Sequence, residues 1–176
     1  AVTGSVGKTG SKESLLHILS EQRKTHASIG SFNNHWGVPL SLSRMPEDTK
    51  FAIFELGMNH PGELGPLSKM VRPHVALITT IEAVHLEFFS DVEAIARAKA
   101  EIFEGLTSSG SVILNGDNSY GGLLKSIAAN AGITHILTFG EKSEADIRLT
   151  DFTLYPDYSD VAVEIASHEV FFRLGV

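Results

Sequence analysis

A glycine-rich segment near the start of the chain, Thr3-Gly4-Ser5-Val6-Gly7-Lys8-Thr9, constrains the fold more than any other feature of the sequence. An apolar pair precedes it and an amphipathic stretch follows it, which is typical of a turn joining a buried strand to a helix. Glycine lets the backbone approach a ligand closely, so that successive N–H groups can bind phosphate oxygens. The lysine can reach terminal phosphates and the threonine hydroxyl can ligate Mg²⁺. The predicted nucleotide-binding residues are Gly4, Ser5, Val6, Gly7, Lys8, Thr9 and Gly10.

The spacing within this segment departs from the common phosphate loop. That loop has four residues between its first glycine and the Gly-Lys pair, whereas here only Ser5 and Val6 separate Gly4 from Gly7. A glycine turn that merely begins an ordinary helix therefore stays open as an alternative at this point.

Composition narrows the class of protein. The chain has 176 residues, 43% of them hydrophobic and 20% charged, which fits one globular domain with a sizeable core. The net charge of −7 argues against a broad basic surface for nucleic acid, but a nucleotide needs only a local positive site. There is no cysteine, which excludes disulfides and Cys-ligated zinc. We find no signal peptide and no apolar run that would insert into a membrane. The sequence at its two ends predicts that this chain is a piece of a longer protein.

Strand and helix patterns alternate along most of the chain. Helices are predicted over residues 8–22, 39–42, 61–72, 90–106 and 120–131, and strands over residues 50–56, 75–80, 111–114 and 135–139, with a loop over residues 25–35. This order predicts an α/β fold over residues 1–145, a three-layer P-loop NTPase-like domain with a mostly parallel sheet. Residues 146–176 alternate apolar and polar side chains in three short segments, which predicts a small C-terminal antiparallel meander.

Two residues at strand ends are candidate metal ligands. Glu55 ends a buried strand, and in an open parallel sheet the ligand crevice lies at the carboxyl ends of the strands. The carboxylate could hold Mg²⁺ or merely cap a nearby loop. His85 follows the next strand and could be a metal ligand or a loop hydrogen bonder.

Lys99 occupies an unusual position. The apolar stripe of its helix runs through Val92, Ile95, Ala96, Ile102 and Phe103, and a lysine in its middle would bury an ammonium group. The side chain could extend to the helix edge, or it could be a desolvated amine with a lowered pKa that becomes nucleophilic. The sequence alone does not decide between them.

Three asparagines complete the set of candidates. Asn33, Asn34 and Asn59 lie in loops predicted to face the same crevice. Loop amides are usually turn formers, so their spacing alone does not establish a binding role.

Read together, the motifs resemble the central, ATP-binding domain of the Mur ligase family, and the short phosphate loop is the form that this family uses. The resemblance runs from residue 2 to about residue 118 and rests on four further segments: SFNNHWGVPL (31–40), ELGMNHPGEL (55–64), AVHLEFF (83–89) and ARAKAEIF (96–103). These segments are similar to the branch of the family that adds D-alanyl-D-alanine to a UDP-N-acetylmuramoyl tripeptide. Two positions depart from it: Gly10 stands where many members have Thr, and Asn118 where Asp is common.

The resemblance implies a role for each candidate. Lys8 would contact the ATP phosphates, Thr9 and Glu55 would form one Mg²⁺ site, and His85 would contribute to a second. Lys99 matches a lysine that CO₂ carbamylates, and the carbamate oxygens would ligate the second Mg²⁺. The catalytic residues expected by resemblance are Lys8, His85 and Lys99. The substrate residues expected by resemblance are Asn33, Asn34 and Asn59.

The implied function is ATP-dependent amide-bond formation through an acyl phosphate, in cytoplasmic peptidoglycan precursor synthesis. The expected ligands are ATP, two Mg²⁺ ions, UDP-N-acetylmuramoyl-tripeptide and D-alanyl-D-alanine. The full-length enzyme is expected to be a monomer with an N-terminal UDP-binding domain and a C-terminal domain, both outside this chain. Three alternatives stay open: another ligase such as a different Mur ligase or a folylpolyglutamate synthase, a P-loop kinase or GTPase-like switch, and a nucleotide-binding module without catalysis.

Overall fold

The computed structural model describes residues 1–84 and 86–175, and its centre is a seven-stranded sheet. The strands lie in the order β1-β4-β5-β6-β7-β8-β9. Neighbours from β1 to β7 pair in parallel, and β7, β8 and β9 pair antiparallel. The strand bounds are β1 (Val2–Thr3), β4 (Val75–Ile78), β5 (Ser111–Asn115), β6 (His135–Gly140), β7 (Ile147–Leu154), β8 (Tyr158–Ile165) and β9 (His168–Gly175).

A second, two-stranded parallel sheet extends the first on the β1 side. It consists of β2 (Thr25–Ala27) and β3 (Phe51–Ile53). A single parallel bridge joins Val2 to Glu55, with backbone hydrogen bonds of 2.8 Å from Val2 N to Phe54 O and from Leu56 N to Val2 O. The bridge brings Glu55 beside β1, the strand that leads into the phosphate loop.

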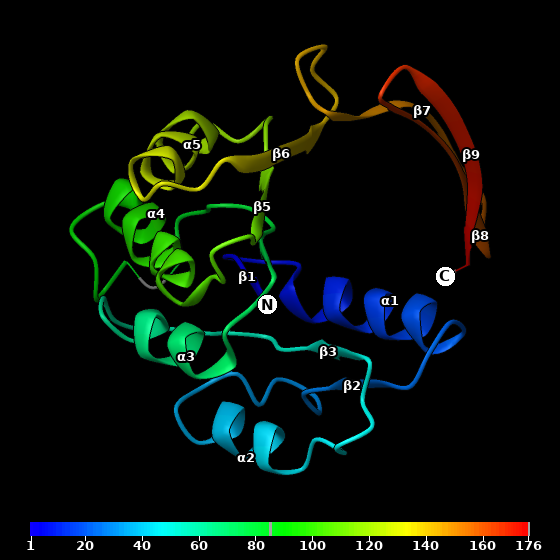
Figure 1. Cartoon of the computed structure of the whole chain (residues 1–176). Helices are drawn as coiled ribbons and strands as arrows, with labels where there is room; N and C mark the ends of the chain where they lie inside the picture. Colours follow the sequence, from blue (N-terminus) through cyan, green and yellow to red (C-terminus); the bar gives the residue numbers. More distant parts are fainter. Residues whose placement is uncertain (85, 176) are drawn as a thin grey trace.

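Helices cover both faces of the sheet around the predicted site. Figure 1 shows α3, α4 and α5 on one side and α1 on the other, with the meander curving away beyond β6. The main apolar core lies between the sheet and α2–α5, and includes Phe54, Ile78, Ile95, Leu114 and Leu124. The helix bounds are α1 (Lys8–Ser20), α2 (Gly37–Ser43), α3 (Leu64–Val71), α4 (Val92–Ala100) with the following 3₁₀ helix η1 (Glu101–Gly105), and α5 (Gly121–Asn130). The predicted α/β class with a C-terminal meander is confirmed.

The structure corrects several predictions about single elements. Residues 25–35 are not all loop, because Thr25–Ala27 form β2. The helix predicted from residue 90 begins at Val92, and its N-cap is Asp91, whose side chain accepts a hydrogen bond from Ala94 N. The predicted helix 90–106 changes at Ala100 into η1. The predicted meander continues the main sheet, since β7 pairs with β6 in parallel.

Two apolar side chains on the helices are exposed to solvent. Ile18 of α1 is 52% exposed and Met70 of α3 is 50% exposed. The buried side of α1 includes Lys12 together with the half-buried Leu15, Leu16 and Leu19. Among the described residues, no helix has the length and apolar character needed to cross a membrane.

Candidate nucleotide and metal site

The phosphate loop lies between β1 and α1 and depends on its two glycines. Gly4 has φ +147°, and a Cβ at this position would lie 1.9 Å from the Thr79 hydroxyl oxygen. Gly7, at the start of α1, has φ +83°, a conformation that side-chain-bearing residues rarely adopt. The Ser5 hydroxyl accepts a hydrogen bond from Glu82 N at 2.9 Å, which ties the loop to the segment after β4. The backbone therefore has the bend that the motif predicts.

Gly4→Ala and Gly10→Ala form a matched pair that tests this conformation. We expect Gly4→Ala to lower the free energy of unfolding by about 2 kcal/mol or more, because the new methyl group overlaps Thr79. A Cβ at Gly10 would meet nothing within 4 Å, so Gly10→Ala should raise it by about 0.5–1 kcal/mol through helix propensity. Urea unfolding followed by circular dichroism measures both. Equal effects of the two substitutions would contradict this account of the loop.

Glu55 is the centre of the site. Its side chain is buried, with 1% exposure, at the carboxyl end of β3. Thr9 Oγ1 donates to one carboxylate oxygen at 2.9 Å, and Asn33 Nδ2 donates to the other at 2.7 Å. Glu55 N donates to Ser28 Oγ at 3.2 Å. Residues from the phosphate loop, the segment after β2 and β3 thus converge on one carboxylate.

The electrostatics of the site involve two lysines. Burial lowers the pKa of Lys8, and the charge of Glu55 partly opposes this effect. Lys8 Nζ donates to Gly4 O at 2.9 Å and to Ser5 O at 3.3 Å. Burial, with a smaller contribution from the positive charge of Lys8, lowers the pKa of Lys99 from 10.5 to about 7. The loop lysine and the helix lysine are therefore close enough to repel each other.

Lys99 does not extend to the helix edge. Its side chain is buried in α4 with 2% exposure, so the interpretation as a solvent-reaching lysine is wrong. In the described part of the chain, residues 1–84 and 86–175, no hydrogen bond or ion pair reaches its amine. The lowered pKa favours the uncharged amine, which is the form that reacts with an electrophile.

The other predicted residues lie in different settings. Asn34 Oδ1 accepts hydrogen bonds from Trp36 N and Gly37 N at 3.1 and 2.9 Å, so its side chain caps the start of α2. Asn59 is exposed, and its backbone N donates to Glu63 Oε2 at 2.8 Å. Of the three asparagines, the structure brings only Asn33 to Glu55. His85 lies outside the described residues.

The donor set around Glu55 fits Mg²⁺. Within residues 1–84 and 86–175 there is no group of three or more His, Cys, Asp or Glu side chains that could hold a metal. Mg²⁺ does not need one, because it keeps several waters and binds one or two carboxylates together with substrate phosphates. A buried carboxylate and a hydroxyl 2.9 Å apart beside a phosphate loop provide hard oxygen ligands of this kind.

Sequence reasoning missed a cavity of about 570 Å³ beside the phosphate loop, at the carboxyl ends of β4 and β5. Asn118 helps to form it by donating to Ile81 O at 2.8 Å and to Thr80 Oγ1 at 3.1 Å. Glu82, which binds Ser5 of the phosphate loop, is part of its lining. No local sequence motif predicts this cavity, because its walls come from segments about 35 residues apart.

Sequence reasoning also missed Lys12. Its side chain is completely buried, and its ammonium group contacts the segment that carries Asn33. The available signal was helical spacing, since Lys12 precedes Leu15, Leu16 and Leu19 by three, four and seven positions.

Comparison with known proteins gives the class to which this fold and site belong. Residues 2–175 match the family described as the Mur ligase middle domain. The chain belongs to the Mur ligase family.

Similar curated proteins are the UDP-N-acetylmuramoyl-tripeptide--D-alanyl-D-alanine ligases. The Rickettsia prowazekii protein of this name is 44% identical over 149 residues, which are 85% of this chain and 33% of that protein. The Bacillus subtilis protein is 38% identical over 150 residues, 85% of this chain and 31% of that protein. The chain thus spans about a third of the length of these relatives.

Solved structures agree. A crystal structure of MurF from Acinetobacter baumannii has a TM-score of 0.91 and 34% identity, covering 99% of this chain and 37% of that chain. MurF ligase from Thermotoga maritima in complex with ADP has a TM-score of 0.86 and 27% identity, covering 99% of this chain and 40% of that chain. A folylpolyglutamate synthase from L. casei, at 13% identity and a TM-score of 0.70, shares the fold alone.

Proposed function

We propose that this chain is the ATP-binding part of a ligase that adds D-alanyl-D-alanine to UDP-N-acetylmuramoyl-tripeptide. The observation that carries the proposal is the convergence of Thr9, Glu55 and Asn33 at the end of a phosphate loop, with a buried lysine, Lys99, beside Lys8. A kinase or a GTPase-like switch gives no reason for the buried Lys99. The names of the relatives at 34–44% identity supply the substrates. The flanking parts of the enzyme would hold the peptide substrates, with Asn33, Asn34 and Asn59 on the facing side of this chain.

ATP would lie along the carboxyl edge of the sheet. The N–H groups of the phosphate loop and the start of α1 would bind the phosphates. The cavity at the carboxyl ends of β4 and β5, lined by Thr80, Glu82, Asn115 and Asn118 among others, would receive the base. The neighbour from Thermotoga maritima was solved with ADP, which supports nucleotide binding by the family.

Thr9 and Glu55 would hold one Mg²⁺, and Lys99 as its carbamate, together with His85, would hold a second. The carbamate forms when the neutral amine attacks CO₂ and releases one proton, which converts a buried cation into an anion with two oxygen ligands. Burial of Lys99 favours this reaction because it favours the neutral amine. Bound Mg²⁺ would supply charge neutralisation at the transferring phosphoryl group.

The chain's own contribution to the chemistry is positioning and positive charge. A substrate carboxylate oxygen attacks the γ-phosphorus, and the bond to the bridging oxygen of ADP breaks, which gives an acyl phosphate. The amine of D-alanyl-D-alanine then attacks the acyl carbon, loses a proton and expels phosphate to form the amide. Lys8 would move from its two carbonyl partners to the terminal phosphates and neutralise developing charge in the first step.

The proposal is tested by substrate-dependent release of ADP. We expect the full-length cytoplasmic ligase to release ADP in repeated turnovers only when both the UDP-linked tripeptide and D-alanyl-D-alanine are present, and to prefer ATP over GTP. We expect this chain alone to bind nucleotide and to show no turnover, since the peptide-binding parts lie elsewhere. ADP release that is equally fast with D-glutamate or a diamino acid as acceptor would contradict the assignment to this branch. Ligation by this chain alone would contradict the proposal that other parts of the enzyme hold the peptide substrates.

A further inference from the structure

Lys12 is a completely buried lysine that the proposed reaction does not use. It lies one helical turn after Thr9 on α1 and has 0% exposure. Its Nζ donates to Ser28 O at 2.8 Å and to Gly30 O at 2.6 Å, and it forms an ion pair with Glu13 Oε1 at 2.8 Å. Of the three protons of the ammonium group, two are donated to carbonyl oxygens, and the Glu13 carboxylate supplies a neighbouring negative charge. The buried charge is therefore paired, and both of its hydrogen-bond acceptors are carbonyls of a single loop.

The loop held by Lys12 is the segment between β2 and α2. Its residues from Ser28 to Asn33 belong to no helix or strand, so its course depends on bonds made to its backbone. Ser28 N donates to Ile53 O at 3.2 Å, and Gly57 N donates to Asn33 O at 2.8 Å. Between these two points, Gly30 adopts φ +52°, and the Lys12 ammonium contacts the carbonyls on either side of Ile29. Lys12 thus fixes the loop midway between its two backbone anchors.

This loop carries two groups that contact Glu55. The Ser28 hydroxyl accepts from Glu55 N, and Asn33 Nδ2 donates to the Glu55 carboxylate at 2.7 Å. The opposite carboxylate oxygen accepts from Thr9, which lies on the same helix as Lys12. The Asn33 amide packs against Gly57, where a Cβ would lie 2.5 Å from Asn33 Oδ1, so the missing side chain at position 57 makes room for the amide. One helix therefore orients Glu55 twice, directly through Thr9 and through the loop by way of Lys12.

We propose that Lys12 is a positioning residue that holds Asn33 against Glu55 and thereby fixes the orientation in which Glu55 ligates metal. Its chemistry suits the task, because a long cation can bond two carbonyls across a gap that an apolar side chain would only fill. A methionine could occupy the same volume in the buried face of α1, but it would leave Ser28 O and Gly30 O without their donor. The metal part of this inference rests on the proposed function of Glu55.

The first test needs no metal. We expect the side-chain amide resonances of Asn33, in ¹⁵N-labelled protein, to move in Lys12→Met toward the positions that they take in Glu55→Gln, where one hydrogen-bond acceptor is weakened. Lys12→Arg keeps the donors and should leave them closer to wild type. Unmoved Asn33 resonances in Lys12→Met would overturn the inference, whatever the metal does. Lys12→Gln, a shorter donor with no charge, serves if Lys12→Met does not fold.

The second test measures how the affinity for a non-hydrolysable ATP analogue depends on Mg²⁺ concentration, by calorimetry. We expect Lys12→Met to raise the Mg²⁺ concentration for half-maximal effect about five- to tenfold, with little change in affinity without Mg²⁺. Asn33→Ala should do the same, and the double variant should be no worse than either single one, because both remove the same restraint. Ala128→Gly, in the core of α5, should lower thermal stability without this shift.

Three results separate the possibilities. A Lys12→Met variant that loses thermal stability but keeps the wild-type Mg²⁺ dependence, as Ala128→Gly should, would overturn the inference. Additive effects of Lys12→Met and Asn33→Ala would overturn the route through Asn33. If Glu55→Gln leaves the Mg²⁺ dependence unchanged while the Asn33 resonances still move in Lys12→Met, the metal role of Glu55 fails and the positioning of Asn33 by Lys12 stands.

Discussion

Replacing Lys8 with methionine should weaken ATP binding roughly a hundredfold, which corresponds to about 3 kcal/mol. Lys8 is the cation on the phosphate loop itself, and in the free protein its ammonium group bonds only the carbonyls of Gly4 and Ser5 among residues 1–84 and 86–175. Those neutral acceptors can be exchanged for phosphate oxygens, which form stronger, charge-assisted bonds. Isothermal titration with ATP and Mg²⁺ measures the loss.

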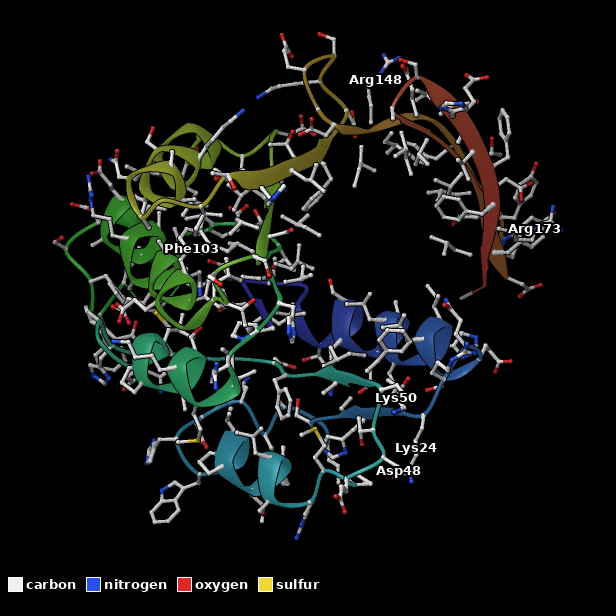
Figure 2. All side chains as sticks on the ribbon, viewed as in Figure 1. Lys24, Asp48, Lys50, Phe103, Arg148 and Arg173 are labelled. Atoms are coloured by element: carbon white, nitrogen blue, oxygen red, sulfur yellow. The ribbon has the colours of Figure 1, made fainter. Side chains whose placement is uncertain are left out.

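Lys24→Met is the matched control. Lys24 lies at the surface next to β2, where it pairs with Asp48 at 2.6 Å (Figure 2). A surface ion pair contributes little, so this substitution should leave both stability and ATP affinity close to wild type. If Lys8→Met bound ATP as tightly as Lys24→Met does, the phosphate loop would not be the nucleotide site.

The order of elements could be predicted because each strand and helix carries its own pattern. The apolar run at residues 50–56 and the stripe that includes Ile95 and Ile102 both mark surfaces that are buried in the structure. Glu55 could be placed at the ligand edge for a related reason: parallel strands end on the same side of a sheet. β2 was missed because Thr25–Ala27 is only three residues long and half-buried throughout, which leaves no alternation to detect.

Contacts between distant segments could not be predicted in this way. The hydrogen bond from Asn33 to Glu55 joins residues 22 apart, and that from Thr9 joins residues 46 apart, so neither follows from local spacing. Lys12 was overlooked for a different reason: a lysine on a helix is ordinarily solvent-exposed, and only the carbonyls of the β2–α2 segment make its burial favourable. Lys99, in contrast, could be singled out from the sequence, because the apolar stripe of its helix continues on both sides of it.

Lys12 and Lys99 show why two buried lysines have different consequences. Lys12 has two carbonyl acceptors and an ion pair with Glu13, whereas within the described residues Lys99 has neither a hydrogen bond nor an ion pair. A charge that is desolvated without a partner is destabilising, and the protein relieves the cost by releasing the proton. The same property that makes Lys99 suitable for carbamylation therefore makes the stability of the unmodified protein depend on pH.

Lys99→Met should make this pH dependence disappear. The pKa of Lys99 is about 7 in the folded protein and 10.5 in the unfolded chain, so between these values the unfolded chain binds the additional proton. Stability of the wild type should therefore rise with pH from about 7 to 10.5 in CO₂-free buffer, by at most roughly 5 kcal/mol, and be lowest below pH 7. Lys99→Met has no such proton and should be more stable than wild type at pH 6, with the difference shrinking toward pH 10. Urea unfolding at a series of pH values measures both curves.

Lys69→Met is the control for Lys99→Met, because Lys69 is 60% exposed and pairs with Glu104 on the surface of α3, so its curve should follow that of the wild type. Parallel curves for wild type and Lys99→Met would show that the pKa of Lys99 does not differ between the folded protein and the unfolded chain.

Carbamylation of Lys99 can be tested with the same variants. Adding ¹³C-labelled bicarbonate with Mg²⁺ should give a carbamate signal by NMR in the wild type and in Lys69→Met but not in Lys99→Met. In the full-length ligase the variant without this signal should lose ligation by roughly a thousandfold or more, since it lacks the anion that would neutralise the second Mg²⁺. Full activity of Lys99→Met would contradict the proposal that Lys99 is needed for ligation.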